Sequence, residues 1–216
     1  MRLTLHRKTH GKHIMPKYSI IIPAHNAETR IVKALESVVA QTYTDYEIIV
    51  ICDACDDNTA DIARKYGATV IKVDFRNPGL TRSAGLDAAT GEWILFMDDD
   101  DWWLHEYVLE QIDGQVSVND CDLLCFGFIW KGRGYTSPNR PGGIYWPAVW
   151  CKCWRRSIIG DTRFPAEYPD DLLFHNKMVS TKMMRIKSWE MPLYYYNYWR
   201  EGSISCQKEP DLRFKK

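Results

Sequence analysis

Short apolar runs alternate with segments that favour helices through the first half of the chain. Four of these runs have the length of buried strands: Tyr18–Pro23, Glu47–Cys52, Ala68–Val73 and Trp93–Met97. Largely apolar runs of this length are typical of parallel strands that are covered on both faces. The segments 26–39, 57–67 and 78–89 lie between them, and the first carries apolar residues at helical spacing. This order predicts an α/β fold, with a mostly parallel sheet flanked by helices on both faces.

Local signals mark where the predicted helices begin and end. Asn26 can accept hydrogen bonds from free backbone N–H groups, so we predict it as the N-cap of the first helix. Asp57 or Asn58 would cap the second helix in the same way. Gly67 suits the left-handed position that often follows a helix, and it therefore predicts the end of the second one.

The second half of the chain has a weaker pattern. Helices are expected at His105–Ile112 and Asp170–Val179, and strands at Cys121–Trp130 and Leu193–Trp199. We therefore predict one domain over residues 17–216, with a regular half at 17–103 and a smaller, irregular half at 104–216. Residues 1–16 are basic and polar, which favours a flexible extension.

Composition narrows the classes of function. The 216 residues carry 28 Lys and Arg against 28 Asp and Glu, and this balance argues against a nucleic-acid binder, which needs a basic face. No apolar stretch reaches the length of a transmembrane helix, and the N-terminus lacks the apolar core of a signal peptide. We therefore expect a cytoplasmic protein without a transmembrane segment. Nothing in the sequence predicts an oligomeric state.

Polar residues gather where three of the predicted strands end, at residues 23–26 (PAHN), 53–57 (DACDD) and 98–101 (DDDD). The carboxyl ends of parallel strands meet at one edge of a sheet, where ligands of such sheets bind. A solvated acidic turn is one interpretation of the Asp run, because blocks of like charge are usually exposed. The other is a site for a divalent cation that carries a phosphorylated ligand, since hard cations bind carboxylate and phosphate oxygens. The convergence of three clusters favours the second interpretation.

Seven cysteines raise a separate alternative. Cys52 and Cys55, together with Cys151 and Cys153, have the residue types of a four-thiolate zinc site. However, Cys52 ends a buried strand pattern, and the other pair lies in an apolar, aromatic-rich run where small thiols pack well. Reduced thiols in a core are the favoured interpretation, because no secretory signal indicates an oxidising compartment.

Several motifs, in this order and spacing, resemble those of the family 2 glycosyltransferases. Residues 19–26 (SIIIPAHN) are similar to the family's opening strand and turn, and residues 47–59 (EIIVICDACDDNT) to its second strand and loop. Residues 82–94 and 96–101 resemble a later helix with its following strand, and the acidic motif. The resemblance implies a GT-A fold and an inverting enzyme that takes sugar from a nucleotide-sugar donor, with a UDP-sugar expected.

The resemblance also divides the chain by role. Residues 17–103 would bind the nucleotide sugar, and residues 104–216 would bind the acceptor. The acceptor would be a glycan, a lipid-linked molecule reached by peripheral contact with a membrane, or a protein. Nothing in the second half chooses among these three.

The acidic motif receives specific roles from the resemblance. A nucleotide diphosphate brings negative charge into a site already lined by Asp, so Mn²⁺ or Mg²⁺ is expected to bridge the two. Asp100 matches the family's metal ligand, and Asp98 matches the acid that contacts the ribose or supports the metal through water. We also predict that Asp99 is one of the residues that bind the donor.

Four further residues match the family's donor pocket. Pro23 and Ala24 would line the pocket for the base, and Asp53 would bind the edge of uracil. Arg82 matches the donor-site Arg, and a guanidinium suits both phosphate and base recognition. Without the surrounding motifs, Arg82 would be interpreted as a surface residue of a helix.

Inverting transfer needs one general base, which takes the proton of the acceptor hydroxyl as it attacks. The resemblance puts this base in an acidic pair at the start of a helix in the second half. Asp170 and Asp171 match that pair, with Asp171 as the base. Acids at helix N-termini also serve simply to complement the helix dipole, but the upstream motifs favour catalysis.

The chain departs from the family's usual residues at five positions: His25 for Tyr, Cys52 for Asp, Cys55 for Ser, Ser83 for Asn and Asp170 for Glu. The predicted metal and base positions are retained, so these changes bear on donor choice more than on chemistry.

The alternative function is a catalytically degenerate relative that binds sugar nucleotide or a partner without turnover. A nucleotidyltransferase is disfavoured because no Gly-rich loop follows the first strand, and the spacing after Asp98 excludes an EF-hand.

Overall fold

The computed structural model describes residues 15–140 and 144–198. The extension predicted at residues 1–16 therefore lies almost entirely outside the described residues. Within the described ranges, no helix combines the length and the apolar character needed to cross a membrane.

The first half contains four strands that alternate with three helices, as the apolar pattern predicts. The elements are β1 (Tyr18–Ala24), α1 (Ile31–Val39), β2 (Tyr46–Asp53), α2 (Thr59–Lys65), β3 (Thr69–Val73), α3 (Pro78–Ala88) and β4 (Trp93–Phe96). The four strands pair in parallel in the order β3-β2-β1-β4. Their carboxyl ends therefore lie at one edge of the sheet.

The second half contributes further strands to the same sheet. The elements are β5 (Trp102–Trp103), α4 (Val108–Val118), β6 (Leu123–Trp130), β7 (Gly134–Thr136), β8 (Asn139–Arg140), β9 (Ile144–Tyr145), β10 (Lys152–Arg155), α5 (Arg156–Ile159), α6 (Asp170–Thr181) and β11 (Ile186–Tyr196). The nine-stranded sheet continues from β4 through β10, β6 and β11 to β5, with β7 beside β6. β10 runs antiparallel to both β4 and β6, whereas β11 is parallel to β6. The part expected to be irregular is thus a continuation of the sheet.

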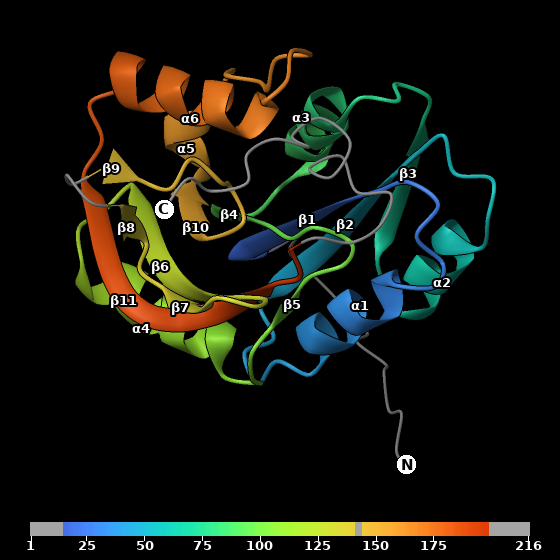
Figure 1. Ribbon diagram of the computed structural model, residues 1–216, viewed down its shortest axis with the longest axis horizontal. Helices are drawn as coiled ribbons and strands as arrows, with labels where there is room; N and C mark the ends of the chain where they lie inside the picture. The colour runs from blue at the N-terminus through green and yellow to red at the C-terminus, as the bar shows by residue number, and fades with distance from the viewer. Residues whose placement is uncertain (1–14, 141–143, 199–216) are drawn as a thin grey trace.

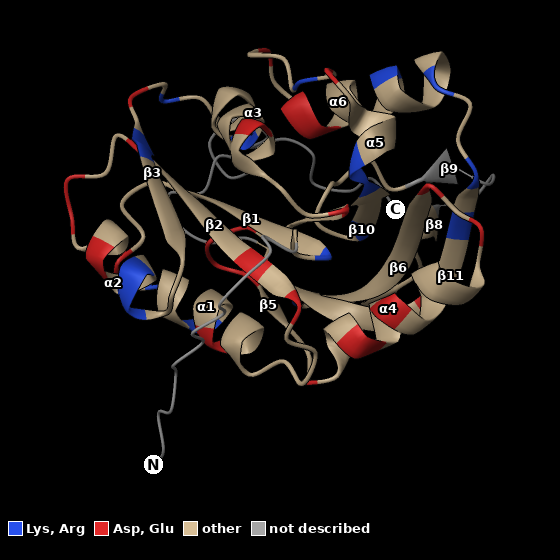
Figure 2. Ribbon diagram, turned by 180° about the vertical axis from the view of Figure 1, so that it is seen from behind, with Lys and Arg blue, Asp and Glu red and all other residues tan. Residues whose placement is uncertain are grey.

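Helices cover both faces of the sheet, with α1, α2 and α4 on one face and α3, α5 and α6 on the other (Figure 1). Strand β1 shows why its sequence is apolar throughout. Ile20 and Ile22 point into the core under α1, while Ile21 points into the core under α3, and all three are fully buried. Most charged residues lie on helices and loops, and the strands are mostly uncharged (Figure 2).

Helix α3 approaches its neighbours closely because it contains glycine at two contact positions. A Cβ atom at Gly85 would clash with the side chain of Ile21 in β1, and one at Gly79 would clash with the carbonyl oxygen of Pro165. Helix α3 is therefore held against the sheet and against the segment that leads into α6. This contact brings Arg82 of α3 near the acidic start of α6.

Predicted boundaries are wrong at three elements, and the largest difference is at β11, which begins at Ile186 instead of Leu193. Helix α1 begins at Ile31, and Asn26 is not its N-cap but a turn residue with φ of 44°. The side-chain oxygen of Asn26 accepts a hydrogen bond from the backbone N–H of Asp56, so it joins the ends of β1 and β2 (3.0 Å). Helix α4 begins at Val108 instead of His105 and extends to Val118.

Candidate functional site

The Asp run follows β4 at the edge where the parallel strands end. Asp99 and Asp101 are buried, while Asp98 and Asp100 are partly exposed, so the four carboxylates alternate in environment. Asp101 is fully buried and accepts hydrogen bonds from the hydroxyl of Tyr194 and the backbone N–H of Asn197, both at 2.7 Å. Burial raises the pKa of Asp101 well above its ordinary value. This segment is therefore anchored to β11 and is not a solvated acidic turn.

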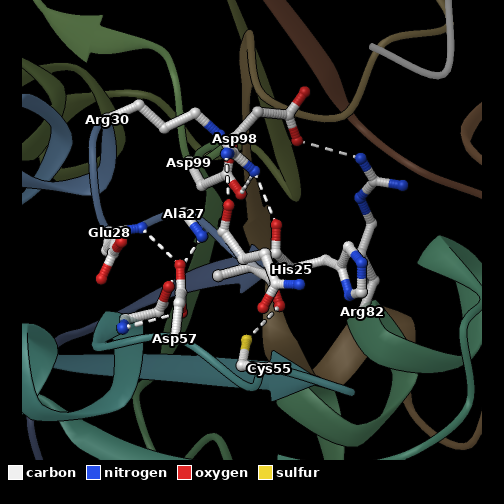
Figure 3. A network of polar contacts seen from close by, with 12 residues as sticks. His25, Ala27, Glu28, Arg30, Cys55, Asp57, Arg82, Asp98 and Asp99 are labelled. Carbon is white, nitrogen blue, oxygen red and sulfur yellow. Dashed lines mark hydrogen bonds and ion pairs between the residues drawn. The ribbon is translucent and has the colours of Figure 1, made fainter. Parts of the chain in front are cut away.

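Arg30 holds Asp99 from the turn before α1. Its guanidinium donates two hydrogen bonds to the Asp99 carboxylate, at 2.7 and 2.8 Å, and two more to the backbone oxygens of His25 and Asn26. The loop after β1 and the loop after β4 are thereby cross-linked by one cation (Figure 3). The sequence motifs gave no sign of this role, because a single Arg in a turn has no diagnostic spacing.

Replacing Arg30 by glutamine is expected to lower the free energy of unfolding by about 2 kcal/mol, because Asp99 would keep its charge and lose a paired donor. Urea denaturation measures this change. The matched control is Arg64→Gln, which breaks a largely exposed pair with Asp61 and should cost less than about 0.5 kcal/mol. Equal costs for the two variants would contradict the assignment of Arg30 as a cross-link.

Arg82 links the Asp run to helix α6. Its guanidinium bonds Asp98 at 2.9 Å and Asp170 at 2.6 Å, and its side chain is only 11% exposed. Figure 3 shows Arg30 and Arg82 approaching the Asp98–Asp99 segment from opposite sides. Burial raises the pKa of Asp98 to about 6; Arg82 opposes this effect, and Asp100 adds to it. Among the described residues, Nε of Arg82 is buried without a hydrogen-bond partner.

Asp171 is the second residue of α6 and lies beside this ion-pair network. The helix starts at Asp170, directly after Pro169, so both acids fall in its first turn. Asp171 is partly exposed, and one of its oxygens accepts a hydrogen bond from the backbone N–H of Leu172 at 2.8 Å. Burial raises the pKa of Asp171; Arg82 opposes this rise and Asp170 reinforces it. A carboxylate with a raised pKa suits a general base.

Asp53 has an environment that its motif did not indicate. Its carboxylate accepts hydrogen bonds from the backbone N–H groups of residues 75–77 and from the hydroxyl of Thr81, at 2.7 to 2.9 Å. These bonds lower the pKa of Asp53 below its ordinary value, although burial alone would raise it. Asp53 therefore holds the segment that leads into α3, and contact with a uracil base stays a prediction.

Pro23 and Ala24 form the last residues of β1 and adjoin β2. Ala24 is almost fully buried, and its backbone oxygen accepts a hydrogen bond from the thiol of Cys55 at 3.4 Å. Nδ1 of His25 lies 2.6 Å from the backbone oxygen of Asp53. The ends of β1 and β2 are thus joined directly, and their role in a base pocket also stays a prediction.

The carboxylates suit a divalent ion that is shared with a ligand. Among residues 15–140 and 144–198, no group of three or more His, Cys, Asp or Glu is arranged to hold a metal ion. A four-thiolate zinc site at Cys52, Cys55, Cys151 and Cys153 is therefore not supported. However, Mg²⁺ is often held by one or two carboxylates, with phosphates and water completing its shell. Asp98, which pairs with Arg82, and Asp100, which lines a hollow of about 560 Å³, are the two carboxylates predicted to bind such an ion.

The predicted residues thus fall into two groups. Asp98, Asp99 and Asp170 are held together by Arg30 and Arg82, with Asp100 and Asp171 beside them. Pro23, Ala24 and Asp53 form the adjoining end of β1 and β2. The first group contains the two carboxylates predicted to bind a cation, Asp98 and Asp100, and the carboxylate of Asp171, whose pKa is raised, at the start of a helix.

A sequence profile described as "Glycosyl transferase family 2" matches residues 19–185, which include both groups. The chain belongs to this family. The poly(ribitol-phosphate) beta-N-acetylglucosaminyltransferase TarP of Staphylococcus aureus is 33% identical over 58% of this chain and 40% of its own. The uncharacterized glycosyltransferase YibD of Escherichia coli is 38% identical over 88% of this chain and 63% of its own.

Solved structures agree with this membership. The S. aureus TarS 1–349 structure in complex with UDP-GlcNAc superposes with a TM-score of 0.76 at 27% identity, covering 87% of this chain and 60% of that one. The likeness confirms the predicted GT-A fold of a family 2 glycosyltransferase. The chain spans less than two thirds of the length of each of these three relatives.

Proposed function

We propose that this family 2 member is an inverting glycosyltransferase that moves sugar from a UDP-sugar to a hydroxyl of a glycan, lipid-linked or protein acceptor. The observation that carries the proposal is the network in which Arg82 joins Asp98 of the acidic motif to Asp170, next to Asp171. This network connects a diphosphate-binding motif with a candidate base. The UDP-GlcNAc complex of the TarS relative supports the choice of donor.

Asp100 and Asp98 would hold Mn²⁺ or Mg²⁺ together with the donor diphosphate. The ion, when bound, would offset the charge that develops on the departing diphosphate. Arg30 and Arg82 keep Asp99 and Asp98 in place before the donor arrives, because both arginines are already paired. Asp98 would also contact the ribose, and Asp99 would support the donor site through Arg30.

Asp171 would remove the proton from the acceptor hydroxyl during attack. Its raised pKa makes the carboxylate a better proton acceptor than an ordinary Asp. Arg82 lies close enough to favour the ionised form, which a base requires. Pro23, Ala24 and Asp53 would bind the uracil base beside the diphosphate.

A thermal-shift screen of nucleotide sugars, with and without Mn²⁺, tests the proposal. A UDP-sugar present at a hundred times its dissociation constant should stabilise the folded chain by about 2.7 kcal/mol. Asp100→Asn should lose the metal-dependent part of this stabilisation. Asp161→Asn, which changes an exposed acid outside the site, should retain it. Stabilisation by no nucleotide sugar, with or without the metal, would contradict the proposal.

The same proteins and nucleotide sugars can distinguish a transferase from a relative that only binds the donor. A transferase releases the nucleotide diphosphate in the presence of an acceptor, whereas a degenerate relative binds the donor and releases none. Release should depend on Asp171, and binding should not.

A further inference from the structure

Two cysteines lie together at the carboxyl end of β2, and the proposed reaction does not use them. Cys52 is the penultimate residue of β2 and is 1% exposed, whereas Cys55 is partly exposed in the following loop. Ala54 between them has φ of 49°, a left-handed conformation that turns the chain sharply after the strand. Cys55 packs against the core cluster that contains Cys52, and its sulfur lies 3.4 Å from the backbone oxygen of Ala24, the residue opposite Cys52 on β1. Both are free thiols.

The two thiols have opposite acid–base character. A side-chain interaction with Cys52 is the main cause that lowers the pKa of Cys55 to about 7, with help from the backbone N–H of Asn26 and against the effect of burial. The pKa of Cys52 is raised. Burial raises the pKa of the other described cysteines, which are Cys121, Cys125, Cys151 and Cys153. Cys55 is therefore the most reactive of the described thiols, because the thiolate is the nucleophilic form.

We propose that Cys52 and Cys55 are a redox-active dithiol, which a hydroperoxide converts into a disulfide at the edge of the donor site. The placement carries the proposal: the partly exposed Cys55 follows the buried Cys52 by three residues across a sharp turn, and both adjoin Ala24 at the end of β1. Cys55 is the attacking residue, and Cys52 is the resolving residue.

The chemistry balances with hydrogen peroxide as the oxidant. The Cys55 thiolate attacks one peroxide oxygen, which breaks the O–O bond, forms a sulfenic acid and, with one proton, releases water. The Cys52 thiol then attacks the Cys55 sulfur, forms the S–S bond and releases a second water. Two thiols lose two electrons and two protons in total, and the peroxide is reduced to two waters. A small dithiol such as dithiothreitol reverses the reaction by thiol–disulfide exchange.

The disulfide would change the end of β1. The Cys55 thiol donates a hydrogen bond to the backbone oxygen of Ala24, and Figure 3 shows Cys55 directed at this strand end. A disulfide has no S–H group, so this bond is lost and the sulfur is drawn towards Cys52. Because Ala24 belongs to the proposed base pocket, oxidation should weaken donor binding. This consequence rests on the proposed function, whereas the dithiol itself does not.

Peptide mass spectrometry of the full-length chain tests the dithiol without any substitution. At pH 7 a limiting amount of an alkylating agent should modify Cys55 at least about tenfold faster than the buried thiols of Cys121, Cys125, Cys151 and Cys153. After treatment with one equivalent of hydrogen peroxide, the peptide with Cys52 and Cys55 should lose two hydrogens and resist alkylation, and dithiothreitol should restore both thiols. Oxidation of Cys55 that stops at sulfenic or sulfinic acid, with Cys52 still alkylated, would overturn the proposal.

Variants assign the order of the two steps. Cys52→Ser should leave Cys55 as a sulfenic acid that a dimedone probe captures, and Cys55→Ser should leave Cys52 unmodified. Cys121→Ser, which changes a buried thiol elsewhere, should form the disulfide like the natural chain. Capture of a sulfenic acid at Cys52 instead would contradict the assigned order.

Donor binding gives the second readout. The UDP-sugar found by thermal shift should bind the oxidised chain at least about tenfold more weakly than the reduced chain. A disulfide that forms and leaves affinity unchanged would overturn the link to the donor site. A disulfide in a chain that binds no nucleotide sugar in either state would contradict the proposed function and leave the dithiol established.

Discussion

Asp171→Asn is expected to reduce turnover about a thousandfold, because an amide cannot take the proton of the acceptor hydroxyl. Donor affinity should stay within about a factor of two, since the change removes an interaction that is needed only for the chemical step. Release of the nucleotide diphosphate at saturating donor measures turnover, and calorimetric titration measures affinity. Normal turnover in this variant would show that Asp171 is not the base.

The neighbouring acid supplies the matched control. Asp170 is almost fully buried and pairs with Arg82. Asp170→Asn should therefore act mainly on the free energy of unfolding, and less on the rate of the chemical step. The pH dependence gives an independent check in the natural chain. Because burial raises the pKa of Asp171, turnover should decline on acidification at a higher pH than an ordinary Asp would give.

Arg82→Leu is expected to lower the free energy of unfolding by about 3 to 5 kcal/mol, because it leaves the buried carboxylate of Asp170 and the partly exposed carboxylate of Asp98 without their cation. The side chains of Asp98 and Asp170 are 27% and 6% exposed, so water can replace little of what Arg82 supplies to Asp170. Urea denaturation measures the loss. Donor binding should fall as well, since Asp98 would no longer be held.

Two further variants separate this effect from the loss of an ordinary surface charge. Arg163→Leu breaks a more exposed pair with Asp87 and should cost less than about 1 kcal/mol. Adding Asp170→Asn to Arg82→Leu should recover part of the stability, because one stranded carboxylate is neutralised. A cost below about 1 kcal/mol for Arg82→Leu would contradict the buried network.

The first half of the fold could be predicted because its strands are buried on both faces. Such strands need apolar residues at every position, as Ile20, Ile21 and Ile22 show. The central strand β10 could not be predicted in this way. It is four residues long and begins with Lys152, a fully buried cation whose Nζ bonds the backbone oxygens of Trp146 and Ala148.

The position of the candidate site in the fold could be predicted from topology, but the contacts of its individual side chains could not. Parallel strands end at one edge, so the placement of Asp53 and the Asp run at the same edge of the sheet was predictable. The sequence does not show which of Asp98 to Asp101 are buried, whereas the structure distinguishes them through distant partners. Tyr194 buries Asp101, and Arg30 binds Asp99, and neither partner has a spacing that marks its role.

In the proposed donor complex, Asp100 and the diphosphate share one divalent ion. A crystal of the chain grown with Mn²⁺ and UDP, with anomalous scattering recorded for manganese, tests this most directly. We expect a manganese peak roughly 2.0 to 2.2 Å from an Asp100 oxygen, with diphosphate oxygens on the same ion. UDP bound at the strand ends with no manganese beside Asp100, or UDP bound elsewhere, would contradict it.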